Sequence, residues 1–122
     1  MASLIIISGE KTGNHYPLGK RTNVIGRDEG VLIQIIDEHI SRKHLQIRYD
    51  KEKNQYLALD MKSRHGVFIN GNRIQEERPL QNNDKIDVGD TTLLFTTADF
   101  PDRQSALAYH RQVGQRGLGT LE

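Results

Sequence analysis

Short β-prone segments separated by turn signals fill most of this chain, and they constrain its fold more than any other feature. Between residues 3 and 97 there are roughly ten such segments, and none has a convincing helical period. Leu4 to Ser8 is a continuous apolar run, as in a buried strand, whereas Leu45 to Tyr49 alternates apolar and polar residues. Asn70-Gly71 is the strongest hairpin signal. The pattern predicts an all-β fold, an antiparallel sandwich or barrel.

The character of the sequence changes after residue 97. Residues 102–113 carry a weak apolar stripe preceded by Pro101, and three glycines follow it. We therefore expect one domain over residues 1–97 and a C-terminal extension over residues 98–122. The extension is either a linker to a further domain or a packed cap, and it forms one short helix or a disordered tail.

Charge and composition exclude several classes of function. The chain has 17 basic and 16 acidic side chains and a net charge of +1, so attraction of the whole protein to nucleic acid or to an anionic membrane is not expected. It has no cysteine, which excludes disulfides, thiol catalysis and zinc–thiolate sites. No apolar run approaches the roughly 20 residues of a membrane helix, and no targeting signal is evident, which favours a cytoplasmic protein. No metal-ligand spacing or cofactor motif is present, so no cofactor is expected.

Three polar segments stand at the ends of predicted strands, and each carries a cation. They are Gly26-Arg27, Ser41-Arg42-Lys43-His44 and Ser63-Arg64-His65-Gly66. Two of them place a hydroxyl beside the cation. Arginine offers a rigid fork of donors and serine a single O–H, which together suit a doubly charged oxyanion such as a phosphate monoester.

In this order and spacing, the segments resemble the motifs of the forkhead-associated (FHA) domain family. The resemblance covers about residues 3–97 and rests on four pieces: Gly26-Arg27, Ser41-Arg42-Lys43-His44, the run from Asp60 to Gly71, and the run from Leu80 to Gly89. It implies an eleven-stranded antiparallel β-sandwich whose loops, at one end, bind phosphothreonine in a partner protein or in a neighbouring chain segment. A Ser/Thr kinase pathway would then supply the mark.

The resemblance also implies roles for individual residues. Arg27 would pair with the phosphate and Ser41 would donate its hydroxyl to a phosphate oxygen, with Arg42 and Arg64 as further phosphate or peptide contacts. Structural roles fall to the motif residues Gly26, His44, Gly66 and Asn70, of which His44 would brace the loop that holds Ser41 and Asn70 would tie loops together.

His65 departs from the family pattern, because an asparagine that hydrogen-bonds the peptide backbone usually stands there. A neutral imidazole replaces an amide only in part. A protonated one would add charge toward the phosphate, in a pH-dependent way around its ordinary pKa of ~6.5. This departure motivates an alternative function, a phosphate-independent interaction or self-association module.

An enzyme is the least favoured class. Ser41, His44 and Asp60 invite a hydrolase interpretation, but the chain lacks a Gly-x-Ser-x-Gly elbow. A serine and a histidine three residues apart on a loop-to-strand passage are not evidence for a nucleophile and its base.

Overall fold

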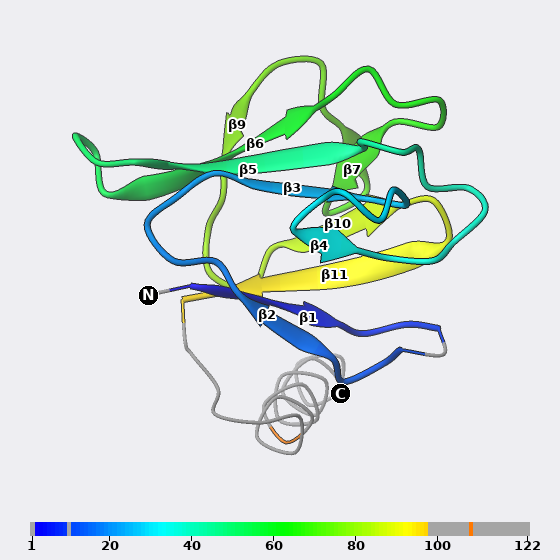
Figure 1. Ribbon diagram of the computed structural model, residues 1–122. Helices are drawn as coiled ribbons and strands as arrows, with labels where there is room; N and C mark the ends of the chain where they lie inside the picture. The colour runs from blue at the N-terminus through cyan, green and yellow to red at the C-terminus, as the bar shows by residue number, and fades with distance from the viewer. Residues whose placement is uncertain (1, 10, 98–107, 109–122) are drawn as a thin grey trace, which may run out of the picture.

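The computed structural model describes residues 2–9, 11–97 and 108, and its strands form two packed β-sheets (Figure 1). Within these residues there are eleven strands, which confirms the expected β-sandwich. Their bounds are β1 Ser3–Ile6, β2 His15–Pro17, β3 Asn23–Gly26, β4 Ile33–Gln34, β5 Leu45–Asp50, β6 Gln55–Asp60, β7 Val67–Ile69, β8 Asn72–Arg73, β9 Arg78–Pro79, β10 Lys85–Val88 and β11 Thr91–Thr96.

The two sheets have different strand orders. The six-stranded sheet runs β2-β1-β11-β10-β7-β8 and the five-stranded sheet runs β4-β3-β5-β6-β9. Neighbours pair antiparallel, except for a short parallel contact between β3 and β4 in which Ile25 faces Ile33. Pro17 lies in β2 at the edge of its sheet, as expected for a residue that lacks a backbone N–H.

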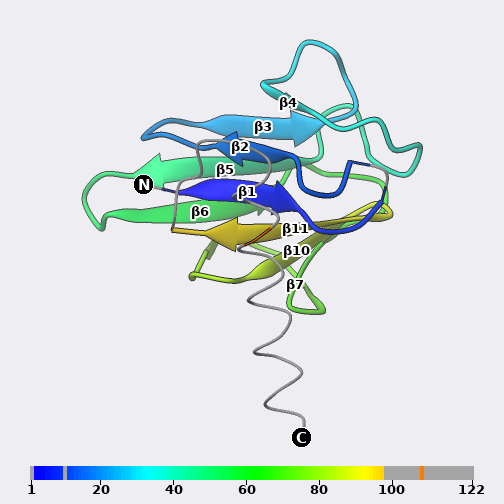
Figure 2. The same ribbon diagram turned by 90° about the horizontal axis from the view of Figure 1, so that it is seen from below.

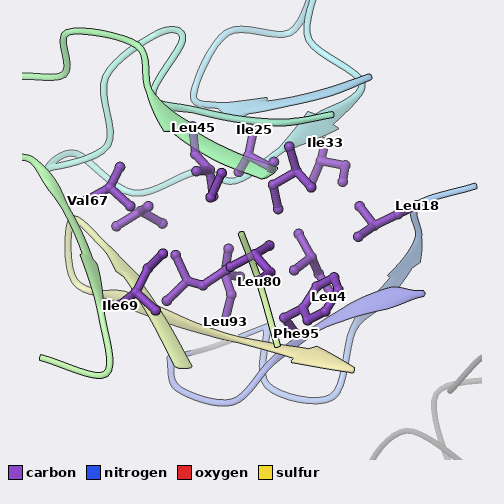
Figure 3. Close-up of a cluster of buried hydrophobic side chains, with 14 of the residues drawn as sticks. Leu4, Leu18, Ile25, Ile33, Leu45, Val67, Ile69, Leu80, Leu93 and Phe95 are labelled. Atoms are coloured by element: carbon purple, nitrogen blue, oxygen red, sulfur yellow. The ribbon is translucent and has the colours of Figure 1, made fainter. Parts of the chain in front are cut away.

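The core fills the space between the inner faces of both sheets. Figure 3 shows Ile25, Leu45 and Ile33 of the five-stranded sheet pointing toward Leu4 and Leu93 of the other. Side chains of this kind are almost completely buried, so packing of the two sheets holds the strand ends in fixed positions. The loops that follow those strand ends therefore begin at fixed positions.

Several loops gather at one end of the sandwich. In Figure 1 the β4–β5 loop and the β10–β11 turn lie at the right-hand end, and the β5–β6 hairpin and the N-terminus lie at the left; the view from below in Figure 2 keeps these two ends apart. The end that carries the β4–β5 loop is therefore the one to which the predicted phosphate ligands belong.

Two details differ from the sequence-based expectations or fall outside the structure. The β-prone stretch Val31 to Ile36 forms only the two-residue strand β4, and Leu32 and Ile36 are 62% and 74% exposed. The predicted C-terminal helix lies outside the described residues, except for Ala108. In the part of the chain that the structure describes, no helix has the length and apolar character needed to cross a membrane.

Candidate functional site

Arg27 follows the last residue of β3, and its position is fixed by the β4–β5 loop. Its backbone N–H donates to the Ser41 carbonyl at 3.0 Å, and its Nε–H donates to the Ile40 carbonyl at 3.0 Å. The terminal nitrogens of the guanidinium remain as donors on an exposed side chain. Gly26 allows the β4–β5 loop to lie close to the end of β3, because a Cβ at that residue would lie 2.0 Å from the Arg42 carbonyl oxygen.

His44 connects the β4–β5 loop with the β6–β7 loop from inside the protein. Its side chain is completely buried, its Nδ1 lies 3.0 Å from the Ser41 backbone nitrogen, and its Nε2 lies 2.7 Å from the Gly66 carbonyl oxygen. The first contact needs an acceptor at Nδ1, so Nε2 carries the proton and donates it to the carbonyl. Both ring nitrogens are thus engaged by backbone groups, and the ring is not placed to act as a base for the Ser41 hydroxyl.

The Ser41 hydroxyl makes the second connection between the same loops. Its oxygen accepts the Arg64 backbone N–H at 3.0 Å, and because it acts as the acceptor there, its own hydrogen is available for donation. The β6–β7 loop is also closed on itself. The Ser63 N–H donates to Asp60 at 2.9 Å, and the Ser63 hydroxyl accepts the Gly66 N–H at 3.0 Å. Gly66 has a φ of 88°, which favours glycine.

These loops surround an open hollow of about 430 Å³. We call it the phosphate hollow; it is lined by Arg27, Glu38, His39, Ile40, Ser41, Arg64 and His65. Four of the five predicted binding residues are therefore brought together from three loops. The fifth, Arg42, is exposed and is not one of the residues that line the hollow.

Asn70 stabilises a different pair of turns. Its side-chain amide donates to Asp84 at 2.9 Å, and its side-chain oxygen accepts the Lys85 N–H at 3.0 Å. Asp84 is buried and also accepts the Gln81 N–H at 2.8 Å. This network joins the β7–β8 turn to the start of β10 and does not reach the lining of the phosphate hollow.

Sequence reasoning missed three residues of the hollow, Glu38, His39 and Ile40, and the partner that holds His39. His39 Nδ1 lies 2.5 Å from a carboxylate oxygen of Asp90, on the β10–β11 turn. The hydrogen bond to Asp90 raises the pKa of His39, and the charges of Asp90, Glu38 and Asp37 act in the same direction. His39 lies two residues before Ser41, which is a usable signal, but the contact with Asp90 spans 51 residues and has no local signature.

Asp37, His39 and Asp90 also form the one group of possible metal ligands found among the described residues, with ligand atoms within 4.8 Å of one another. Hydrogen bonds explain this cluster without a metal. Asp37 accepts the His39 N–H at 2.8 Å, the Asp90 N–H at 2.9 Å and the Thr91 hydroxyl at 2.8 Å. Burial favours a higher pKa for Asp37, but these bonds outweigh it and lower the pKa overall.

Comparison with known proteins identifies relatives of this architecture. The family model that matches is the FHA domain, over residues 23–89. The chain is 31% identical over 83 residues to the FHA domain-containing protein FhaA of Mycobacterium tuberculosis, which covers 68% of this chain and 15% of that protein. It is 29% identical over 94 residues to the oxoglutarate dehydrogenase inhibitor of Corynebacterium jeikeium, covering 77% of this chain and 63% of the inhibitor.

Solved structures with the same architecture include the FHA domain of the CT664 protein from Chlamydia trachomatis. It has a TM-score of 0.74 and 26% identity, over 80% of this chain and 98% of that one. An FHA domain studied for its phosphothreonine-dependent interactions has a TM-score of 0.71 and 26% identity, over 81% of this chain and 98% of that one. The chain spans between 15% and 63% of the length of the two curated relatives named above.

Proposed function

Because this chain belongs to the FHA domain family, we propose that it is a phosphothreonine-binding module that uses the phosphate hollow. The observation that carries the proposal is the convergence of Arg27, Ser41 and Arg64, from three separate loops, on one hollow. An FHA domain of similar structure was studied for phosphothreonine-dependent interactions, which supports the same ligand here. The partner is a phosphorylated protein or a phosphorylated segment of a neighbouring chain.

Each side chain has a distinct role in this proposal. The free terminal nitrogens of Arg27 bind two phosphate oxygens, and the Ser41 hydroxyl donates its hydrogen to another oxygen. Arg64 adds positive charge from the β6–β7 loop. His65 contacts the peptide beside the phosphate, and Arg42, outside the lining, contacts the flanking peptide.

The expected affinity is micromolar. A phosphothreonine carries about −1.5 to −2 charges near neutral pH, and each charge-assisted hydrogen bond contributes about 1.5–3 kcal/mol. The cost of ordering a flexible peptide offsets part of that gain. A net binding free energy of roughly −8 kcal/mol corresponds to a Kd of about 1 μM. Such a module is a reversible regulator that binds a mark made by a Ser/Thr kinase, and we place it in the cytoplasm.

Calorimetry with a phosphothreonine peptide tests the proposal. Arg27→Ala is expected to weaken binding about ten- to a hundredfold, since it removes one or more charge-assisted bonds. Arg21→Ala is a matched control, because Arg21 is also exposed but lies before β3 rather than after it, at the other end of the sandwich. The unphosphorylated peptide is expected not to bind measurably. Equal binding of both peptides, or a dimer that survives phosphatase treatment, would instead support the phosphate-independent alternative.

A further inference from the structure

His39 lies on the wall of the phosphate hollow, with Asp90 directly behind it. His39 borders two hollows: the phosphate hollow and a neighbouring one of about 320 Å³ lined by His39, His65, Gly89 and Asp90. Of these two hollows, Asp90 borders only the second. His39 is thus among the residues that line the phosphate hollow, whereas its partner Asp90 is not.

Backbone contacts hold this pair in place. Asp37 accepts both the His39 N–H and the Asp90 N–H, and so fixes the two residues to each other independently of their side chains. Gly89 packs closely against the same backbone, since a Cβ there would lie 2.9 Å from the carbonyl carbon of His39. The backbone positions of His39 and Asp90 thus do not depend on the contact between their side chains.

Several charged or titratable groups lie near the His39 ring. Asp90 contacts Nδ1, Glu38 lies 4.0 Å from Nε2, and the ring of His65 meets it edge-to-face at 5.4 Å between centroids. Asp37 adds a third carboxylate, with an oxygen within 4.8 Å of a ring nitrogen of His39. Arg27 and Arg64 line the same hollow as His39.

We propose that His39, as an imidazolium held by Asp90, is a further phosphate-binding cation of this hollow. The inference rests on the proposed function and deepens it. With a phosphate dianion in the hollow, three groups of alternating charge follow one another: the Asp90 carboxylate, the His39 imidazolium and the phosphate. Both the carboxylate and the phosphate favour the protonated form of the imidazole. Binding is then linked to proton uptake, and the contribution of His39 is present at low pH and lost as the pH rises through the raised pKa of its ring.

Two acidic residues touch the same imidazole, and neutralising them is expected to have opposite effects. Glu38 lines the hollow and repels the phosphate, and its charge favours the His39 proton less than Asp90 does, so Glu38→Gln should bind a phosphothreonine peptide as tightly as the parent or more tightly. Asp90→Asn removes a negative charge that lies near the site, and simple repulsion predicts tighter binding for it too. On our proposal Asp90→Asn instead binds about two- to fivefold more weakly at pH 7.5, the range for one exposed ion pair.

The pH dependence separates the two explanations further. At pH 5.5 the ring of His39 is protonated even without Asp90, so the deficit of Asp90→Asn should disappear or reverse. His39→Gln should lack the contribution at both pH values. Every variant is compared with the parent at the same pH and with the same peptide, so that titration of the phosphate itself, with a pKa of about 6, cancels.

Calorimetry in two buffers of different ionisation enthalpy measures the proton uptake directly, and NMR titration of the His39 ring identifies the group. The parent should take up more protons on binding at pH 7.5 than His39→Gln does, and His65→Asn should retain the uptake. The inference is overturned if Asp90→Asn binds as tightly as the parent or more tightly at pH 7.5, or if the uptake is lost with His65 alone. Loss of phosphate dependence in the parent would overturn the proposed function and this inference together, whereas phosphate-dependent binding with unchanged variants would overturn the inference alone.

Discussion

Replacing His44 by alanine is expected to destabilise the domain and to loosen the phosphate hollow at once. The imidazole is completely buried and satisfies two backbone groups, the Ser41 N–H and the Gly66 carbonyl. Alanine leaves both without a partner. An unsatisfied buried polar group costs about 1–3 kcal/mol, and the cavity left by the ring adds on the order of 1–2 kcal/mol.

The total loss should therefore be about 3–8 kcal/mol. It falls in the lower half of that range if water reaches the Ser41 N–H, since Ser41 is only half-buried. Domains of this kind are usually stable by about 5–15 kcal/mol, so the variant is expected to remain folded only marginally. The functional effect has the same origin, because the two loops that His44 connects carry Ser41 and Arg64.

Urea denaturation followed by circular dichroism measures the free energy of unfolding, and peptide binding is then measured at low temperature on the folded fraction. His65→Ala is the matched control: His65 is exposed and its loss should change the free energy of unfolding by less than about 0.5 kcal/mol. A loss below about 1 kcal/mol in His44→Ala would show that the two backbone groups find other partners, and would refute the reasoning.

Three further predictions concern the supports of the site and of the sheets. Gly26→Ala should weaken phosphopeptide binding by moving the β4–β5 loop away from β3, because the added Cβ would meet the Arg42 carbonyl oxygen at 2.0 Å; NMR shifts confined to those loops would show it. Asn70→Ala should cost about 1–3 kcal/mol in urea denaturation by leaving the buried Asp84 short of a donor, with peptide affinity unchanged. The hydrogen bond from Arg48 lowers the pKa of Glu77. The carboxylate therefore stabilises the fold above its ordinary pKa of 4.5, and the small stability deficit of Glu77→Gln at pH 7 should vanish in strong acid.

The strands and turns of this protein are largely local in origin, which is why they could be predicted. Alternation over Leu45 to Tyr49 matches β5, and the Asn70-Gly71 turn has the positive φ values of 51° and 84° that its residue types favour. Asn83, predicted to tolerate positive φ, has a φ of 70°. Lys62 has a φ of 56° that its residue type gave no reason to expect.

The residues that line the phosphate hollow were harder to predict from the sequence than the strands and turns. A match to family motifs can predict residues that the family shares, and it placed Arg27 and Ser41 in one site. The pairing of His39 with Asp90 depends on how the β10–β11 turn packs against the β4–β5 loop, which is a property of the whole sandwich. The brevity of β4 has a similar cause, since only two residues of the β-prone stretch find partners on β3.

Ligand binding in the phosphate hollow should affect the β6–β7 loop through the Ser41 hydroxyl. Its oxygen already accepts the Arg64 amide hydrogen. A ligand that takes the hydroxyl hydrogen draws electron density onto that oxygen and makes it a stronger acceptor, because linked hydrogen bonds polarise one another. Ligation should therefore slow exchange of the Arg64 amide with solvent deuterium, so that a single alcohol reports the bound state to the neighbouring loop.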